Sequence, residues 1–156
     1  MDPGNASSWG ADWAWGLPLI VLTVVLHAYG LGLVNKEVIS RLRGRQRSQY
    51  SSSLANLIIG ATALSATILH AIEGAIWAIA YRFLGASADN KSAMLYSLNA
   101  MTSYGHTNLQ LPLRWEMMGA LEALNGWILF GLTTAFLFTV IQRAWTPTIE
   151  DPAERP

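Results

Sequence analysis

Ionisable and amide side chains interrupt some of the most apolar segments of this 156-residue chain. His70 and Glu73 are three residues apart, so they share one face if their segment is helical. Counted inward from the ends of their segments, Glu122 and Asn125 lie at a depth similar to that of Glu73. Such groups can join helices through hydrogen bonds, or they can bind a cation or exchange protons. We favour the hydrogen-bonded bracket and keep the cation-binding or proton-linked role as the alternative.

Metal ligation is a second chemistry that the histidines suggest. His27, His70, His106 and Glu73 supply enough nitrogen and oxygen ligands for zinc or iron. The sequence contains neither an HxxxH nor an HExxH pair, and a single i, i+3 step recurs by chance. We therefore expect no enzyme activity and no resident cofactor, and we interpret His27 as a donor for helix packing.

A polar stretch with the sequence MTSYGHTN, residues 101–108, separates two apolar segments. It places Thr102 and Ser103, a glycine and a histidine within five residues. Irregular backbone at membrane depth is tolerated only where protein or a water-filled cavity shelters it. His106 is the residue of this stretch whose ordinary pKa, about 6.5, lies near physiological pH.

The composition favours a bilayer as the surroundings of this chain. Apolar residues make up 52% of it, charged residues only 13%, and seven tryptophans are present. The formal net charge of zero gives no argument for a nucleic-acid partner, and we expect none. The absence of cysteine excludes disulfides, thiolate metal sites and thiol nucleophiles.

Three segments are long and apolar enough to be membrane spans: 17–34, 54–84 and 117–142. Residues 92–101, SAMLYSLNAM, are apolar enough to be buried but far too short to cross. We therefore expect a re-entrant helix there, sheltered by protein.

The distribution of basic residues predicts the orientation of the chain. The loop 35–53 carries five Lys and Arg residues, whereas residues 1–16 carry none. The positive-inside rule places this loop in the cytoplasm and the segment 1–16 outside. Three spans then place the tail, residues 144–156, in the cytoplasm. We expect a multi-pass protein of the plasma or inner membrane, in contact with lipid.

Two motifs carry a resemblance to a known family. Residues 96–108, YSLNAMTSYGHTN, resemble the pore helix and selectivity filter of the potassium-channel family, whose usual filter sequence is TTVGYGD. Thr102, Ser103 and Gly105 match its Thr-Thr-x-Gly, and residues 126–136, GWILFGLTTAF, resemble its inner helix. The resemblance covers residues 54–143, which would form a pore module, and leaves the first span and both tails outside.

The resemblance implies an all-α integral membrane fold with three transmembrane helices, a re-entrant pore helix and a filter loop, assembled as a homotetramer. Backbone carbonyls of four filter loops would replace the hydration shell of a cation, K⁺ or another monovalent ion, which is the transported substrate. The implied filter residues are Thr102, Ser103, Tyr104, Gly105 and His106. Expected filter supports are His70, Glu73, Asn99, Glu122 and Asn125, and expected hinges of the inner helix are Gly126 and Gly131.

The filter departs from the family pattern at four positions: Tyr104, His106, Thr107 and Asn108. An L-residue where the family has glycine, as at position 107, costs on the order of 1–2 kcal/mol per subunit. We therefore expect weak potassium selectivity, and a non-conducting or regulatory protein that keeps the channel fold is the alternative. His106 either packs behind the filter or acts as a gate that closes on external acidification.

Gly119, Ala123 and Gly126 form one stripe of small residues on the third span. Small residues let membrane helices approach closely, so packing is one interpretation of Gly126. The hinge implied by the family resemblance is the other, and a single glycine can serve both.

Overall fold

The fold is all-α, as the sequence predicts. The computed structural model describes residues 3–43, 52–105 and 109–145, and within these ranges it contains no strand. Its helices are α1 (Pro3–Arg43), α2 (Ser52–Phe83), α3 (Asn90–Met101) and α4 (Glu116–Trp145), with a short 3-10 helix η1 (Leu113–Trp115) before α4. The predicted filter residue His106 lies outside the described residues, as do Thr107 and Asn108.

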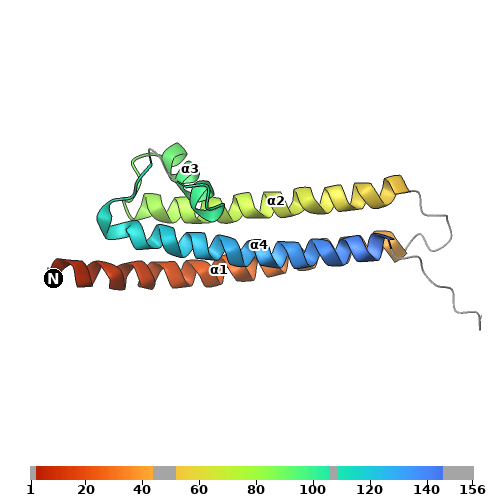
Figure 1. Cartoon of the computed structure of the whole chain (residues 1–156), viewed down its shortest axis with the longest axis horizontal. Coiled ribbons are helices and arrows are strands. Elements are labelled where there is room, and N and C mark those ends of the chain that lie inside the picture. The colour runs from red at the N-terminus through yellow and green to blue at the C-terminus, as the bar shows by residue number, and fades with distance from the viewer. Residues whose placement is uncertain (1–2, 44–51, 106–108, 146–156) are drawn as a thin grey trace, which may run out of the picture.

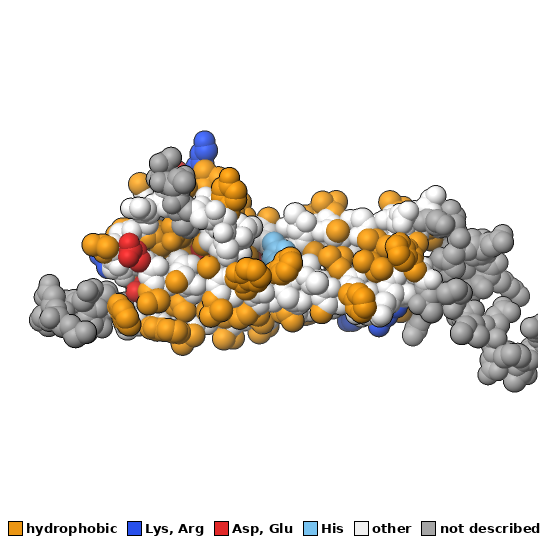
Figure 2. Space-filling view, in the orientation of Figure 1, with side chains coloured by type: hydrophobic (Ala, Val, Ile, Leu, Met, Phe, Trp, Pro, Cys, Tyr) orange, Lys and Arg blue, Asp and Glu red, His pale blue; other side chains and the backbone are white. Residues whose placement is uncertain are grey.

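The three long helices make this a multi-pass membrane protein. Trp9–Arg41, Ser53–Phe83 and Leu113–Trp145 are each long and apolar enough to cross a bilayer. Figure 2 shows apolar side chains along the visible length of the bundle and charged ones towards its ends. The observed α1 is longer than the predicted first span. It also takes in most of the expected outer segment 1–16 and the first residues of the expected loop 35–53.

The long helices lie side by side as a bundle, with α1 and α4 running in one direction and α2 in the other (Figure 1). The short helix α3 packs against α2 and α4 near one end of the bundle. Its 12 residues span only about 18 Å, too little to cross hydrocarbon. Asp89 caps its N-terminus by accepting a hydrogen bond of 2.9 Å from the Ser92 backbone N–H.

The core consists of two apolar clusters with polar side chains between them. The larger cluster lies at the α3 end and contains Trp77, Tyr81, Tyr96, Met118 and Leu121 among its buried residues. The smaller one, Val38, Ile58 and Val140, joins the other ends of the long helices. Buried His27, Glu73, Asn125 and Thr133 occupy the intervening positions along these helices. The polar groups therefore face protein rather than lipid.

Two glycines of α4 allow α3 to approach closely. A Cβ atom at Gly126 would overlap the backbone carbonyl of Met101, the last residue of α3. A Cβ atom at Gly119 would overlap the hydroxyl of Tyr96. The small-residue stripe therefore lies where α4 receives the short helix, which favours the packing interpretation for Gly126.

Candidate functional site

The turn after α3 contains four of the five predicted filter residues. Its backbone folds over the end of the helix: the N–H of Thr102 donates to the Leu98 carbonyl at 3.1 Å, and that of Tyr104 donates to the Asn99 carbonyl at 3.0 Å. Asn99, an expected filter support, thus contributes its backbone carbonyl. The helix end and the turn form one hydrogen-bonded unit.

The sign of φ alternates along this turn. Thr102 has φ −88°, whereas Ser103 has +53° and Gly105 has +91°, with no positive φ at Tyr104. Ser103 is the one non-glycine residue with positive φ in the described part of the chain. A left-handed conformation at such a residue costs on the order of 1–2 kcal/mol. Packing must therefore stabilise this turn against its own backbone preference.

Contacts with α4 provide part of that packing. The indole Nε1–H of Trp127 donates to the Ser103 hydroxyl at 3.0 Å. Beneath the turn lies an open, mainly apolar pocket of about 410 Å³, whose lining includes Thr102, Ser103, His70 and Gly126. Tyr104 points away from the single chain and is 84% exposed.

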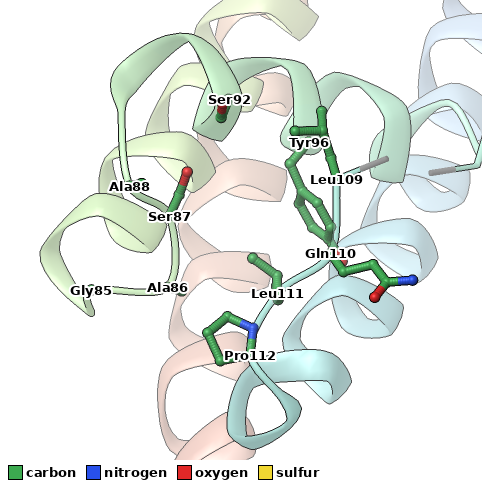
Figure 3. A pocket seen from close by; sticks show the side chains of 10 residues that line it. All are labelled: Gly85, Ala86, Ser87, Ala88, Ser92, Tyr96, Leu109, Gln110, Leu111 and Pro112. Carbon is green, nitrogen blue, oxygen red and sulfur yellow. The ribbon is translucent and has the colours of Figure 1, made fainter. Parts of the chain in front are cut away.

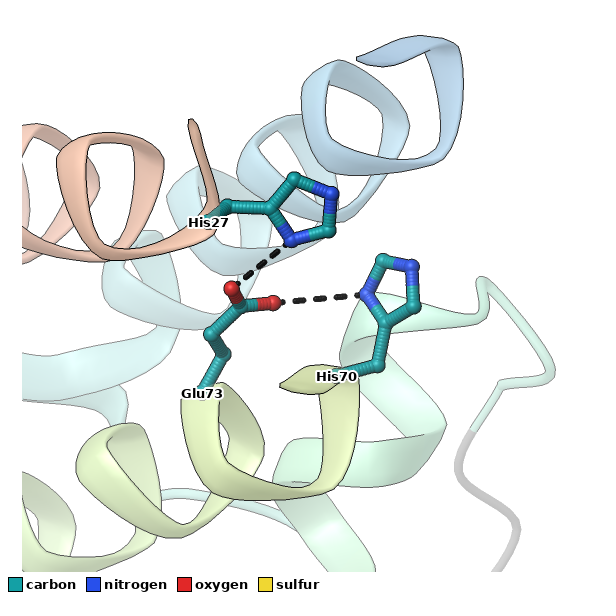
Figure 4. Close-up of side chains that lie close together, drawn as sticks. All are labelled: His27, His70 and Glu73. Carbon is teal, nitrogen blue, oxygen red and sulfur yellow. Dashed lines mark hydrogen bonds and ion pairs between the residues drawn. The ribbon is translucent and has the colours of Figure 1, made fainter. Parts of the chain in front are cut away.

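The buried polar side chains between the two apolar clusters join all three long helices around Glu73 of α2. Its Oε1 lies 2.8 Å from Nδ1 of His27 on α1, and its Oε2 lies 3.4 Å from Nδ1 of His70. Figure 4 shows both imidazole Nδ1 atoms turned towards the carboxylate. The two Nε2 atoms both approach the hydroxyl of Thr133 on α4, at 2.9 Å from His27 and 3.1 Å from His70.

A second buried carboxyl, Glu122 of α4, holds α3 against α2. Tyr81 donates to its Oε2 at 2.6 Å. The Ser97 hydroxyl of α3 lies 2.5 Å from its Oε1 and 2.7 Å from the backbone carbonyl oxygen of Gly74. Ser97 has one hydrogen, so both contacts are hydrogen bonds only when Glu122 carries a proton and donates to Ser97. A neutral Glu122 therefore satisfies the whole network.

The expected bracket is thus built from two separate networks. Glu122 contacts the short helix through Ser97, whereas Glu73 contacts α1 and the bundle centre. The expected role of both residues as filter supports stays a prediction. Asn125 donates to the Thr23 hydroxyl at 2.9 Å and so faces α1 as well. Gly131 is exposed, and no atom lies within 4 Å of a Cβ built there, so its expected role as a hinge stays a prediction.

Sequence reasoning missed four hydroxyl partners and the place of His27. These partners are Thr23, Tyr81, Ser97 and Thr133. Hydroxyl residues are common in apolar helices, where they bond to the carbonyl four residues earlier, as Thr62 does here. The residue types alone therefore do not indicate which hydroxyls bond to another helix. Only the helix arrangement distinguishes those that contact a side chain on another helix.

A further depression lies at the α3 end of the bundle, with a volume of about 590 Å³. Figure 3 shows it between the segments 85–88 and 109–112, beside Ser92 and Tyr96. Burial raises the pKa of the Tyr96 phenol to about 12, so this group stays neutral at physiological pH. The side chains that line the depression are all neutral, and their chemistry points to no ligand.

A scan against protein-family models, a search of curated proteins and a search of solved structures returned no match to this chain.

Proposed function

We propose that this chain is one subunit of a homotetrameric channel that conducts monovalent cations passively across the cell membrane. The observation that carries the proposal is the turn after α3, in which φ alternates in sign from residue to residue. This turn lies in the segment that connects two membrane-spanning helices, α2 and α4. Passive conduction needs no catalytic residue and no cofactor. The transported ion is K⁺ or another monovalent cation, selected weakly.

The alternating backbone supports this function for a physical reason. Where right-handed and left-handed residues alternate, successive N–H groups lie on one side of the chain and carbonyl oxygens on the other. Four copies of the turn around one axis would then present rings of oxygen atoms that replace the hydration shell of a cation. The C-terminus of α3 carries partial negative charge and leads directly into the turn, which further favours a cation there.

The surface next to the turn supports assembly around an axis. Tyr104, Trp127 and Phe130 are large and exposed in the single chain, by 84%, 63% and 59%. Tyr104 follows Ser103 in the turn. Trp127 and Phe130 of α4 line the same pocket as Thr102 and Ser103. Neighbouring subunits would cover these side chains and complete the pocket beneath the turn. Lipid would cover the remaining apolar faces of the helices.

The proposed orientation follows the distribution of charge. The turn, α3 and the N-terminus would face the outside, because the basic residues around the α1–α2 connection belong in the cytoplasm. The C-terminal tail would then lie in the cytoplasm, and His106 would be reached from outside. Under this proposal, external acidification lowers the current, and His106→Asn removes that dependence.

A liposome flux assay tests the proposal. Purified full-length protein should release K⁺ from vesicles, and parallel assays with Na⁺ and with N-methyl-D-glucamine give the selectivity. Gly105→Ala should abolish most of the flux, because φ +91° at this position strains any L-residue in all four copies. Gly60→Ala is the matched control, since no atom lies within 4 Å of a Cβ at this α2 glycine.

The number of subunits distinguishes a conducting tetramer from the alternatives. Native mass spectrometry should give a tetramer for the parent protein and for both variants. A tetramer that releases no ions would favour the alternative, a non-conducting protein that retains the channel fold. A monomer, or equal flux through the Gly105→Ala variant, would overturn the proposed pore.

A further inference from the structure

Three side chains from two helices form a compact set of metal ligands at the centre of the bundle. His27 of α1 and His70 and Glu73 of α2 offer ligand atoms that all lie within 4.8 Å of one another. In Figure 4 the two imidazole rings approach the carboxylate from different helices, each with a nitrogen towards it. Two imidazoles and one carboxylate are a common ligand set for zinc and for other first-row divalent ions.

One of the two distances between carboxylate and imidazole matches the spacing of ligands around a tetrahedral ion, and the other is that of a hydrogen bond. Bonds of about 2.0–2.1 Å at tetrahedral angles separate neighbouring ligand atoms by roughly 3.3–3.4 Å. The distance from His70 Nδ1 to Glu73 Oε2 is 3.4 Å. The second distance, from His27 Nδ1 to Oε1, is 2.8 Å and would lengthen by about half an ångström on metal binding.

One carboxylate oxygen is left without a hydrogen bond. Glu73 is fully buried, and its Oε2 has no hydrogen-bond partner among the described residues. Nδ1 of His70 lies 3.4 Å from this oxygen, which is long for a hydrogen bond. A buried carboxylate oxygen without a hydrogen bond is costly in the absence of a compensating group. A cation between the carboxylate and the two Nδ1 atoms would supply that compensation.

Thr133 of α4 completes the arrangement on the far side of both rings. Its hydroxyl lies 2.9 Å from Nε2 of His27 and 3.1 Å from Nε2 of His70. Without a metal, hydrogens on Nδ1 of both rings would leave two Nε2 acceptors for one hydroxyl hydrogen, whereas one Nδ1–H ring and one Nε2–H ring would satisfy Thr133. With Nδ1 bound to a metal, both Nε2–H groups donate to the two lone pairs of Thr133. Histidine ligands of metals usually have such a partner.

The ion has a path to this set of ligands. The side chain of His70 is 28% exposed, whereas those of His27 and Glu73 are fully buried. His70 lines the pocket of about 410 Å³ beneath the turn at Thr102 and Ser103. The pocket therefore reaches the ligand set at His70, while His27 and Glu73 lie behind this ring.

We propose that His27, His70 and Glu73 bind one first-row divalent metal ion, with Zn²⁺ the best fit, and that Thr133 orients both imidazoles. Ca²⁺ and Mg²⁺ fit poorly, because they require mainly oxygen ligands in larger number. Because two helices share the ion, it ties α1 to α2. The inference rests on the buried ligands alone and stands whether or not the chain conducts ions.

Metal titration of the full-length protein in detergent tests the inference. Co²⁺, a spectroscopic substitute for zinc, should bind once per chain with the visible absorption of four-coordinate cobalt, and Zn²⁺ should displace it. Glu73→Gln and His27→Gln should each weaken binding by more than about 100-fold, and Thr133→Val by roughly 10–100-fold. Glu122→Gln is the matched control, because it changes a buried carboxyl outside the ligand set and should leave the affinity unchanged.

A second measurement covers variants that fail to fold. X-ray absorption at the zinc edge of the parent protein should reveal two imidazole nitrogens and at least one carboxylate oxygen at bonding distance. The inference is overturned if zinc does not bind, if its shell contains fewer than two imidazoles, or if the folded Glu73→Gln variant binds it as tightly as the Glu122→Gln control.

Discussion

Gly126→Ala separates the two interpretations of the α4 glycines. A Cβ at Gly126 would lie 2.7 Å from the carbonyl carbon of Met101 and closer still to its oxygen, whereas ordinary contact begins at 3.4 Å. Helix α3 would therefore have to move by about 0.7 Å or more. The obstacle is backbone that is held by the hydrogen bonds of the helix end, so no side-chain rotation relieves it.

The magnitude follows from a comparison with Gly131→Ala. No atom lies within 4 Å of a Cβ at Gly131, and both glycines lie inside α4. The gain in helix propensity, about 1 kcal/mol, is therefore common to both variants and cancels in their difference. What remains is the overpacking term, typically about 1–3 kcal/mol. We expect the upper part of this range, because the clash involves backbone.

The free energies of unfolding are measured by titrating SDS into the protein in mixed micelles and following the ellipticity at 222 nm. Gly131→Ala should match or exceed the parent protein, and Gly126→Ala should be less stable than Gly131→Ala by the overpacking term. If the two variants are equally stable to within about 0.5 kcal/mol, close packing of α3 on Gly126 is refuted. Gly126 would then be free to act as a hinge alone.

Three further predictions concern other contacts. Gly30→Ala should cost less than the clash with the α3 backbone. The three atoms nearest to a Cβ there all belong to the side chain of Leu69, the closest at 2.8 Å, and this side chain can move. The same SDS titration measures this. Glu122→Gln should change the free energy of unfolding by less than about 1 kcal/mol, since an amide can replace a neutral carboxyl, whereas Glu122→Leu should cost about 1–3 kcal/mol by leaving a buried tyrosine hydroxyl unpartnered. Hydrogen bonds from the Ser92 side chain and backbone lower the pKa of Asp89 below 3.8, so the cap stabilises α3 above that pH and is lost as the pH falls through the lowered value. The protection of the α3 amides, measured by NMR as exchange relative to the intrinsic rate at each pH, should fall over this acidic range in the parent protein and not in Asp89→Asn; equal profiles would exclude the cap as the cause.

The sequence predicts the elements of this fold well, because long apolar runs and one short run leave few alternatives. The observed helices α2 and α4 begin and end within three residues of the predicted segments 54–84 and 117–142. The predicted bounds of the first span, 17–34, are wrong for α1, which extends beyond them in both directions. Polar residues such as Asp12 and Asn35 lie outside the predicted span but inside the observed helix, because helix hydrogen bonding does not depend on side-chain polarity.

The candidate site is less predictable, because its partners come from different helices. The pair His70 and Glu73 follows from helical spacing, but nothing in the local sequence indicates that His27 and Thr133 meet it. Short motifs within one helix cannot indicate a set of possible ligands that two helices assemble, such as His27 with His70 and Glu73. Contacts of this kind depend on the rotation and offset of each helix, which packing of the whole bundle determines.

The polar contacts of α1 limit how this protein can be divided. A fragment that begins at Ser52 would contain α2, α4 and the short helix between them, which together form the proposed pore module. It would also leave Glu73 without His27, and Asn125 without Thr23, on a face newly open to hydrocarbon. An ionised carboxylate in that position costs about 2.5–3.5 kcal/mol. The N-terminal helix is therefore part of the folding unit, and a minimal working version of this protein must retain it.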